Sequence, residues 1–263
     1  MRQTTPLHRG GAGEPLVLLH GFTASWRTWE LVLPALERRH DVLAPTLLGH
    51  AGGPPLPEDP TATSVVDAAE RAMDEAGLET AHLVGNSLGG FVALALAARG
   101  RARTVVALAP AGGWAPGDPD YAEMLQYFAT MHEQTVAAAP HADQLMATRE
   151  GRRLATASIT VQFEHLPAEL LADQLRAAAQ AAAPEMLATV AGGYPELDAA
   201  AITCPVRIVW GTDDQLLRWP TAAVRFREDW LPHADWVVLD GVGHCPQLDV
   251  PLETAQLVLG FTT

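Results

Sequence analysis

One segment decides the fold: residues 82–90 read HLVGNSLGG, and residues 91–98 continue as FVALALAA. The pattern predicts a buried strand, a sharp turn that holds Ser87 between small residues, and a helix that begins directly after it. The glycines around the serine are needed because larger side chains would collide with neighbouring backbone in a strained turn. Such a turn lifts the Ser87 hydroxyl above the sheet and points a helix N-terminus at any negative charge that forms beside it.

A glycine-rich turn between a strand and a helix is also typical of dinucleotide-binding proteins. In that fingerprint the middle position is a glycine, which lets the pyrophosphate approach the backbone. Here the middle position is Ser87, whose side chain would block that approach. The segment is therefore interpreted as a nucleophile turn, and the remaining alternative is an ordinary strand–turn–helix with a chance serine.

Short apolar runs bounded by Gly or Pro alternate with helix-like stretches along most of the chain, as is typical of parallel strands joined by crossover helices. We expect strands at about residues 16–20, 41–45, 80–85, 103–109, 205–211 and 235–240. We expect helices at about residues 27–38, 64–77, 88–99, 220–231 and 251–260. The strand segments are rich in Val, Leu and Ile and do not alternate with polar residues, which indicates a sheet covered by helices on both faces.

The alternation stops between Pro110 and Cys204, where helical spacing is present without a strand pattern. Because the strand pattern resumes at Pro205, we interpret this stretch as an insertion. The prediction is an α/β fold with a mostly parallel central sheet and an inserted helical cap. Residues 1–110 and 204–263 form the core, and residues 111–203 form the cap.

The charge balance excludes several classes of protein. The chain has 17 basic residues, all of them Arg, and 31 acidic residues, for a net charge of −14. Without Lys there is no P-loop lysine, Schiff-base amine or pyridoxal-phosphate anchor. An acidic chain without a basic cluster offers no footprint for nucleic acid. We therefore expect no nucleic-acid partner, and the sequence carries no signal for an oligomeric state.

The two cysteines, Cys204 and Cys245, form no C-x-x-C pair and no disulfide framework. We expect no cofactor, no metal and a reducing compartment, the cytoplasm. The apolar run at residues 16–19 is too short for a signal peptide, and no stretch reaches the roughly 20 apolar residues of a membrane span. We expect no association with a membrane.

A serine hydroxyl needs a base to become nucleophilic, and the base needs a carboxylate to orient it. One predicted strand ends in Gly211-Thr212-Asp213-Asp214, and the next leads into Gly241-Val242-Gly243-His244. Both loops follow strands, at the sheet edge where open α/β folds place their sites. We therefore expect Ser87, His244 and one of the two aspartates to meet there.

Four motifs in this order resemble α/β-hydrolases of the cap-bearing, esterase-like kind: HGF at residues 20–22, GNSLGG at 85–90, WGxxD at 210–214 and GHxP at 243–246. The resemblance runs from about residue 15 to the C-terminus. It implies that Ser87 is the nucleophile and that His244 is the general base and acid. It also implies that Asp214, rather than Asp213, fixes the imidazole tautomer.

The same resemblance assigns the oxyanion hole to the backbone N–H groups of Phe22 and Leu88 and a structural role to His20. The family's usual Asp-x-Pro-Gly-x-Gly loop is replaced by residues 45–53, and fewer than fifteen residues precede Leu16. The first one or two strands of the family's sheet are therefore expected to be shortened or missing.

Substrate choice is expected to depend on the cap, which would form most of the pocket wall. The candidate substrate-binding residues are the adaptable apolar and aromatic side chains Trp114, Met124, Tyr127, Phe128 and Met131. A competing interpretation is that such side chains form the core of the cap. Together they favour a small to medium, largely apolar carboxylic ester as the small-molecule partner. Three arginines, Arg149, Arg152 and Arg153, would hold a carboxylate if they faced inward.

The resemblance to this family leaves other reactions open as alternatives. The GNSLGG turn is similar to that of hydrolases that cleave carbon–carbon bonds in ring-fission products, but those enzymes usually carry an aromatic residue where Cys245 stands. Epoxide hydrolases and haloalkane dehalogenases use a carboxylate where Ser87 stands. A lyase, a biosynthetic catalyst or a ligand receptor on the same fold is the remaining alternative.

Overall fold

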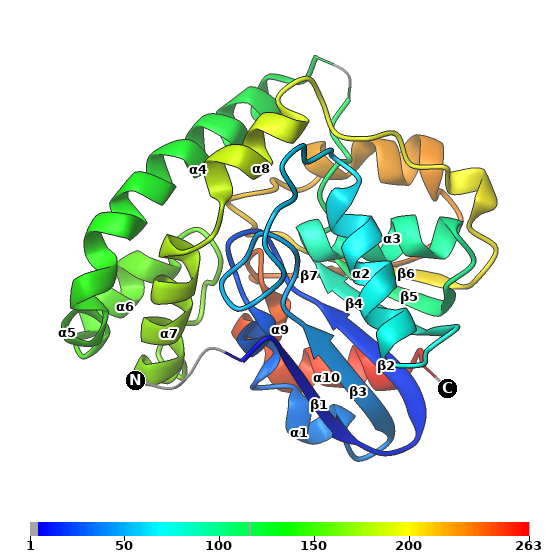
Figure 1. Ribbon diagram of the computed structural model, residues 1–263, viewed down its shortest axis with the longest axis horizontal. Helices are drawn as coiled ribbons and strands as arrows, with labels where there is room; N and C mark the ends of the chain where they lie inside the picture. The colour runs from blue at the N-terminus through cyan, green and yellow to red at the C-terminus, as the bar shows by residue number, and fades with distance from the viewer. Residues whose placement is uncertain (1–4, 116, 263) are drawn as a thin grey trace.

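The computed structural model describes residues 5–115 and 117–262. Seven strands form one sheet in the order β1-β3-β2-β4-β5-β6-β7 (Figure 1). The strands are β1 (Leu7–Gly11), β2 (Glu14–Leu19), β3 (His40–Pro45), β4 (Ala81–Asn86), β5 (Ala102–Leu108), β6 (Val206–Gly211) and β7 (Asp235–Leu239). β1 is antiparallel to β3, and all other pairs are parallel. The predicted α/β fold with a mostly parallel sheet is confirmed.

Both faces of the sheet are covered, as the strand segments rich in Val, Leu and Ile predict. On β2, Val17 and Leu19 pack with helices α2 (Ser64–Glu75) and α3 (Leu88–Ala98). The intervening Leu16 and Leu18 pack on the opposite face, with the short helix α1 (Leu33–Leu36) and with α10 (Pro251–Leu259).

The stretch between β5 and β6 is helical, as predicted. Its helices are α4 (Pro119–Ala138), α5 (Ala142–Met146), α6 (Arg149–Thr156), α7 (Ala168–Ala179) and α8 (Ala183–Val190), with 3₁₀ turns at Ala139–His141 and Ala199–Ala201. We call α4 to α8 the cap helices; in Figure 1 they lie together on one side of the sheet. Their apolar cluster includes Cys245, directly before the short helix α9 (Pro246–Asp249), and Leu248, within that helix. The cap therefore packs directly on the loop that carries His244.

One predicted helix is wrong, and a second is present but irregular. Residues 27–38 contain only a 3₁₀ turn (Trp26–Trp29) and α1, because Pro34 has no N–H to donate and therefore lies in the first turn of a helix that starts at Leu33. The helix predicted at residues 220–231 is continuous over residues 221–230, but it begins as a 3₁₀ turn (Thr221–Ala223) and ends as a π-helical turn (Phe226–Trp230).

The turn between β4 and α3 has the strained geometry that the motif predicts. Ser87 has φ 55° and ψ −117°, a combination that few L-residues adopt. A Cβ atom on Gly85 would lie 2.0 Å from the carbonyl oxygen of Gly89, and one on Gly89 would lie 2.0 Å from that of Leu19. Only glycine therefore lets α3 begin this close to the strands, which fixes where the serine stands.

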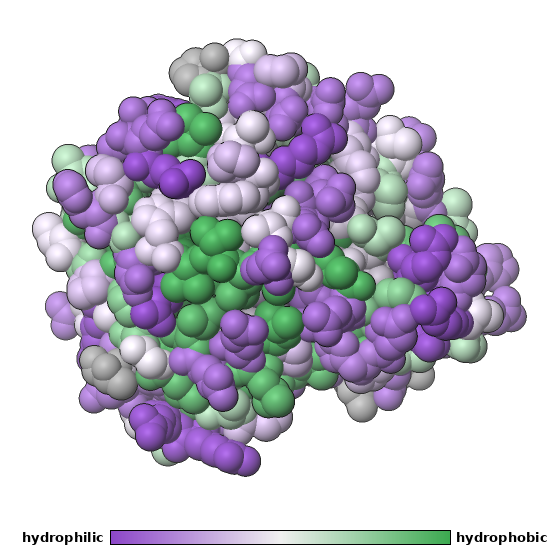
Figure 2. All heavy atoms as spheres, turned by 180° about the vertical axis from the view of Figure 1, so that it is seen from behind, coloured by the Kyte–Doolittle hydropathy of each residue, from purple (hydrophilic) through white to green (hydrophobic). Residues whose placement is uncertain are grey.

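The reverse face of the molecule has apolar side chains near its centre, surrounded by mostly hydrophilic ones (Figure 2). No helix in the part of the chain that the structure describes is both long and apolar enough to span a membrane.

Candidate active site

A buried, hydrogen-bonded pair of side chains lies at the carboxyl ends of β6 and β7. The Nδ1 atom of His244 is 2.7 Å from Oδ2 of Asp214, and both side chains are almost fully buried. The other carboxylate oxygen, Oδ1, accepts from the backbone N–H groups of Leu216 (2.9 Å) and Leu217 (2.7 Å). Both oxygens of Asp214 are thus engaged, which fixes the plane of the carboxylate and with it the orientation of the ring. The neighbouring Asp213 is exposed.

Ser87 and His244 line the same cavity. The Nε2 atom of His244 is buried and has no hydrogen-bond partner among the residues that the structure describes, so no bond to the Ser87 hydroxyl is formed. Such bonds are often long before substrate binds and shorten in the complex. The structure therefore brings Ser87, His244 and Asp214 to one place, with the imidazole nitrogen free to accept a proton.

The amide of Asn86 ties the serine turn to the histidine loop. Its Nδ2 donates to the backbone carbonyls of Leu108 (3.1 Å) and His244 (2.9 Å). Its Oδ1 accepts from the Gln247 amide at 3.0 Å and from the Cys245 thiol at 3.3 Å. Burial and the nearby Asp214 and Asp249 carboxylates raise the pKa of the Cys245 thiol, so Cys245 acts here as a neutral donor.

Asp249 ties the same loop to the cap. Its buried carboxylate accepts from the backbone N–H groups of Gly243 (2.7 Å), Gln162 (2.6 Å) and Val161 (3.0 Å). Sequence reasoning missed Asn86, Gln247 and Asp249. The only signal for them was their position inside or just after two of the motifs.

Two buried histidines hold the loop that carries Phe22. The Nε2 atom of His50 accepts from the backbone N–H of Thr23 at 3.0 Å, and that of His20 accepts from Leu47 at 2.9 Å. The two rings touch edge to face, with centroids 4.8 Å apart. Burial lowers the pKa of His50 to about 4, and burial together with His50 lowers the pKa of His20 well below its ordinary value. Both rings are neutral near pH 7, which is the form that can accept these hydrogen bonds.

The low pKa of His50 makes folding sensitive to acid. The unfolded chain binds a proton at His50 below about pH 6.5, whereas the folded chain does so only near pH 4, so stability is full above pH 6.5 and is lost as the pH falls toward 4. We expect this residue alone to remove about 2 to 3 kcal/mol of unfolding free energy between pH 7.5 and 4.5. Urea unfolding at several pH values measures this contribution. It is the loss of unfolding free energy between pH 7.5 and 4.5 in the wild type minus the loss in His50→Gln.

The exposed His141 provides the control for this measurement. His141→Gln should keep the acid sensitivity of the wild type. Equal pH dependences for wild type and His50→Gln would show that His50 is not held neutral by the fold.

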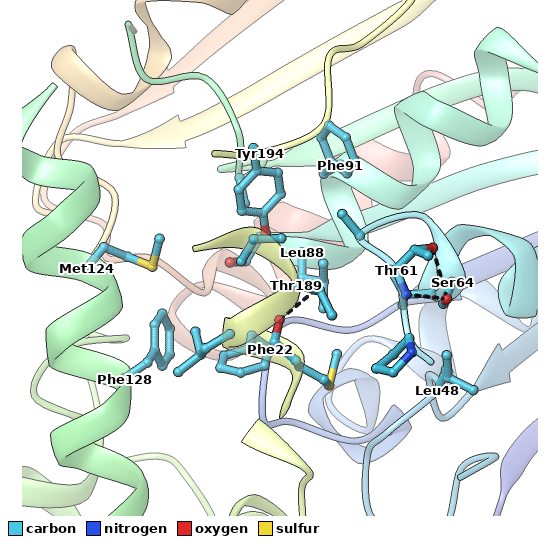
Figure 3. A pocket seen from close by; sticks show the side chains of 18 of the residues that line it. Phe22, Leu48, Thr61, Ser64, Leu88, Phe91, Met124, Phe128, Thr189 and Tyr194 are labelled. Carbon is cyan, nitrogen blue, oxygen red and sulfur yellow. Dashed lines mark hydrogen bonds between the residues drawn. The ribbon is translucent and has the colours of Figure 1, made fainter. Parts of the chain in front are cut away.

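Two compartments flank Ser87. The apolar compartment has a volume of about 60 Å³, and the larger compartment has a volume of about 200 Å³. Ser87, Phe22 and Phe128 line both, Leu88 lines only the apolar one, and His244 lines only the larger one. Figure 3 shows the apolar compartment, with Met124 and Phe128 projecting from one helix toward Phe22.

The predicted substrate-binding residues all line one of the two compartments. Trp114 and Met124 line the apolar compartment, Tyr127 and Met131 line the larger one, and Phe128 lies between them. The three cap arginines line neither. Arg149 pairs with Glu164 and Arg153 with Glu150, both on the surface, while Arg152 donates to the carbonyl of Met146. Within residues 5–115 and 117–262, no group of three or more His, Cys, Asp or Glu side chains is placed to hold a metal ion.

Comparison with known proteins gives the family. The sequence model of the alpha/beta hydrolase family matches residues 16–257. The chain belongs to this family. It is 35% identical over 201 residues to the epoxide hydrolase EphH of Mycobacterium tuberculosis, an alignment that covers 75% of this chain and 92% of the relative. Most of this α/β-hydrolase therefore aligns with a relative that is named as a hydrolase.

Two further proteins are similar to this α/β-hydrolase, one in sequence over part of the chain and one in structure over nearly all of it. A 2-hydroxymuconate semialdehyde hydrolase from Pseudomonas sp. is 42% identical over 115 residues, which is 41% of this chain and 40% of the relative. The solved structure of a carboxylesterase, CesB of Bacillus subtilis, matches with a TM-score of 0.71 at 22% identity, over 97% of this chain and 86% of that chain. The second likeness concerns the fold alone.

Proposed function

We propose that this α/β-hydrolase is a serine hydrolase that cleaves small to medium carboxylic esters with an apolar acyl group. The observation that carries the proposal is the buried His244–Asp214 pair beside a cavity that Ser87 also lines. A general base oriented by a carboxylate, within one cavity of a strained serine, is the arrangement that acyl transfer needs.

In the first step the Ser87 oxygen attacks the ester carbonyl carbon while His244 Nε2 takes the hydroxyl proton. The tetrahedral oxyanion would accept from the backbone N–H groups of Phe22 and Leu88, each worth about 3–4 kcal/mol in the transition state. His244 then gives its proton to the alcohol oxygen as the carbon–oxygen bond breaks, which leaves an acyl-Ser87 ester. Water repeats the sequence, with its proton passing through His244, and releases the acid.

The apolar compartment supports an apolar acyl group. Its walls include Phe91, Trp114, Met124 and Val65, and no charged side chain of the described residues lines it. Its volume of about 60 Å³ favours short chains. An anionic acyl group would lose its hydration there without gaining a partner.

The named relatives suggest two other reactions. Attack of a serine on an epoxide would form an ether, which has no carbonyl for water to attack, so the epoxide activity named for the relative does not follow from Ser87. Carbon–carbon cleavage is the stronger second candidate, because the aligned 115 residues of the semialdehyde hydrolase are 42% identical to this chain. It uses the same His244–Asp214 pair to protonate a carbon leaving group.

The test is a series of p-nitrophenyl esters with acetate, butyrate and dodecanoate acyl groups. We expect kcat/KM to be highest for butyrate or acetate and at least tenfold lower for dodecanoate, because the apolar compartment has a volume of only about 60 Å³. Styrene oxide and a ring-fission product are assayed beside them. Turnover of either with no ester activity above the Ser87→Ala background would contradict the proposal.

A further inference from the structure

The buried carboxylate of Asp249 holds the loop that carries His244. Asp249 is the last residue of α9, and only 2% of its surface is exposed. Its hydrogen-bond partners among the described residues are backbone N–H groups, and none of them is an arginine or a histidine. Burial of a charge costs free energy unless hydrogen bonds compensate for it, so a carboxylate in this position calls for an explanation.

The two carboxylate oxygens join two separate segments of the chain. Oδ2 accepts from the N–H of Gly243, the residue directly before His244, at 2.7 Å. Oδ1 accepts from the N–H of Gln162 at 2.6 Å, and the N–H of Val161 lies 3.1 Å from Oδ1 and 3.0 Å from Oδ2. We call residues 159–162, between α6 and α7, the cap connector. Asp249 therefore joins the histidine loop to the cap connector.

The cap connector also holds the residue on the other side of His244. The N–H of Cys245 donates to the carbonyl of Ile159 at 2.8 Å. A Cβ atom on Gly243 would lie 3.0 Å from the same carbonyl oxygen, so the two backbones are in close contact here. The residues directly before and after His244 are thus both attached to the connector, the first of them through Asp249.

This attachment matters for the reaction because a general base must keep its place. Nε2 of His244 has to come within about 2.6–3.2 Å of the group whose proton it takes, and a misplacement of about 1 Å can cost about a hundredfold in rate. The bond to Asp214 orients the imidazole ring. It does not hold the backbone from which the ring extends, and the contacts to the connector do. Ile159 and His244 also line the same compartment, so the connector forms part of the wall beside the base.

From these contacts we infer that Asp249 is a positioning residue for His244, and that it makes the place of the general base depend on the cap connector. The inference rests on the proposed ester hydrolysis, in which His244 is the base. Asp249 lies outside the four sequence motifs and lines neither compartment. It therefore acts through His244 and not by contact with the substrate.

The experiment measures hydrolysis of p-nitrophenyl butyrate and labelling by a fluorophosphonate in two variants. Asp249→Asn keeps the size of the side chain and one acceptor oxygen, but it turns an amide toward an N–H donor. We expect kcat to fall about tenfold, the effect of one lost hydrogen bond to a charged group, and KM to stay within about twofold. Asp249→Ala removes both acceptor oxygens and should lower kcat about a hundredfold. If Asp249→Ala does not fold, Asp249→Asn carries the test.

The same substitution in the His244→Ala protein separates positioning from a purely structural role. Labelling rates are expressed per folded chain, measured by circular dichroism. Once the imidazole is gone, Asp249→Asn should not slow the labelling further, because the residue through which it acts is absent. A purely structural role would leave the rate unchanged, or would lower it by the same factor with and without His244. Asp240→Asn, at an exposed aspartate four residues before His244, is the matched control and should keep the wild-type rate.

Two results would overturn the inference. One is a wild-type kcat in every Asp249 variant that folds, and the other is an equal fall in the labelling rate with and without His244. A folded wild type that takes no label on Ser87 and hydrolyses no ester would instead overturn the proposed function, and this inference with it. Labelling of the wild type is therefore measured first.

Discussion

Ser87→Ala should lower ester turnover about 10⁶-fold, or to the rate of the uncatalysed reaction. The substitution removes the hydroxyl of Ser87, a residue that lines both compartments, and with it the covalent step. The small alanine side chain fits the same turn, and the His244–Asp214 bond does not involve residue 87. We therefore expect the melting temperature to change little while kcat for p-nitrophenyl butyrate collapses.

His244→Ala and the double variant test whether the residues act as a unit. His244→Ala should cost about as much as Ser87→Ala, and the double variant should be no slower than either single one, because removal of one member already disables the others. Additive losses would indicate two independent contributions, which contradicts a shared proton-transfer path.

Asp214→Asn should lower kcat about 10⁴-fold. Oδ2 of Asp214 accepts from Nδ1–H of His244, so that Nε2 carries a lone pair for the serine proton. An asparagine amide would donate to Nδ1 instead, which moves the imidazole proton to Nε2 and removes the base. Two measurements check this loss. We expect kcat to fall at every pH tested, and KM to change little because Asp214 lines neither compartment.

The adjacent aspartate gives a matched control for this variant. Asp213 is exposed, and its side chain accepts a hydrogen bond from the Thr212 hydroxyl at 3.5 Å. Asp213→Asn should keep kcat within twofold of the wild type. Loss of activity in Asp213→Asn with an active Asp214→Asn would reverse the assignment of the acid.

The sheet and the serine turn could be predicted because their signals are local. Segments rich in Val, Leu and Ile predicted β2 to β7, and the glycines at 85 and 89 marked the turn because backbone atoms approach there within 2.0 Å of where a Cβ would stand. β1 was missed because Leu7–Gly11 is a half-exposed edge strand with one large apolar residue. Its pairing with β3 depends on residues thirty or more positions away, not on its own composition.

In the candidate site, too, some residues could be predicted from the sequence and others could not. The positions of Ser87, Asp214 and His244 follow from motifs that end strands, and the choice of Asp214 over Asp213 agrees with the buried bond to His244. The supporting contacts could not be predicted, because they join side chains to backbone groups brought together only by folding. Asp249 meets the N–H of Val161, 88 positions away, and that contact leaves no periodic or motif signal.

The division of the pocket into two compartments could not be predicted from the sequence either. Met124 and Met131 lie on one helix and have the same chemical character, yet they line different compartments. Phe128 lies between them and touches Phe22 edge to face, with ring centroids 4.9 Å apart. How α4 rests on the core decides which side of this aromatic pair each residue faces, and helical spacing alone does not contain that information.

The most direct test of the account is covalent labelling with a fluorophosphonate, followed by peptide mass spectrometry. The probe loses fluoride when an activated serine oxygen attacks its phosphorus, so it reports the nucleophile without any assumption about the natural substrate. We predict one adduct per chain, on Ser87, formed rapidly by the wild type and at least a thousandfold more slowly by His244→Ala. A folded protein that takes no label, or that is labelled on another residue at the same rate in both proteins, would contradict the account.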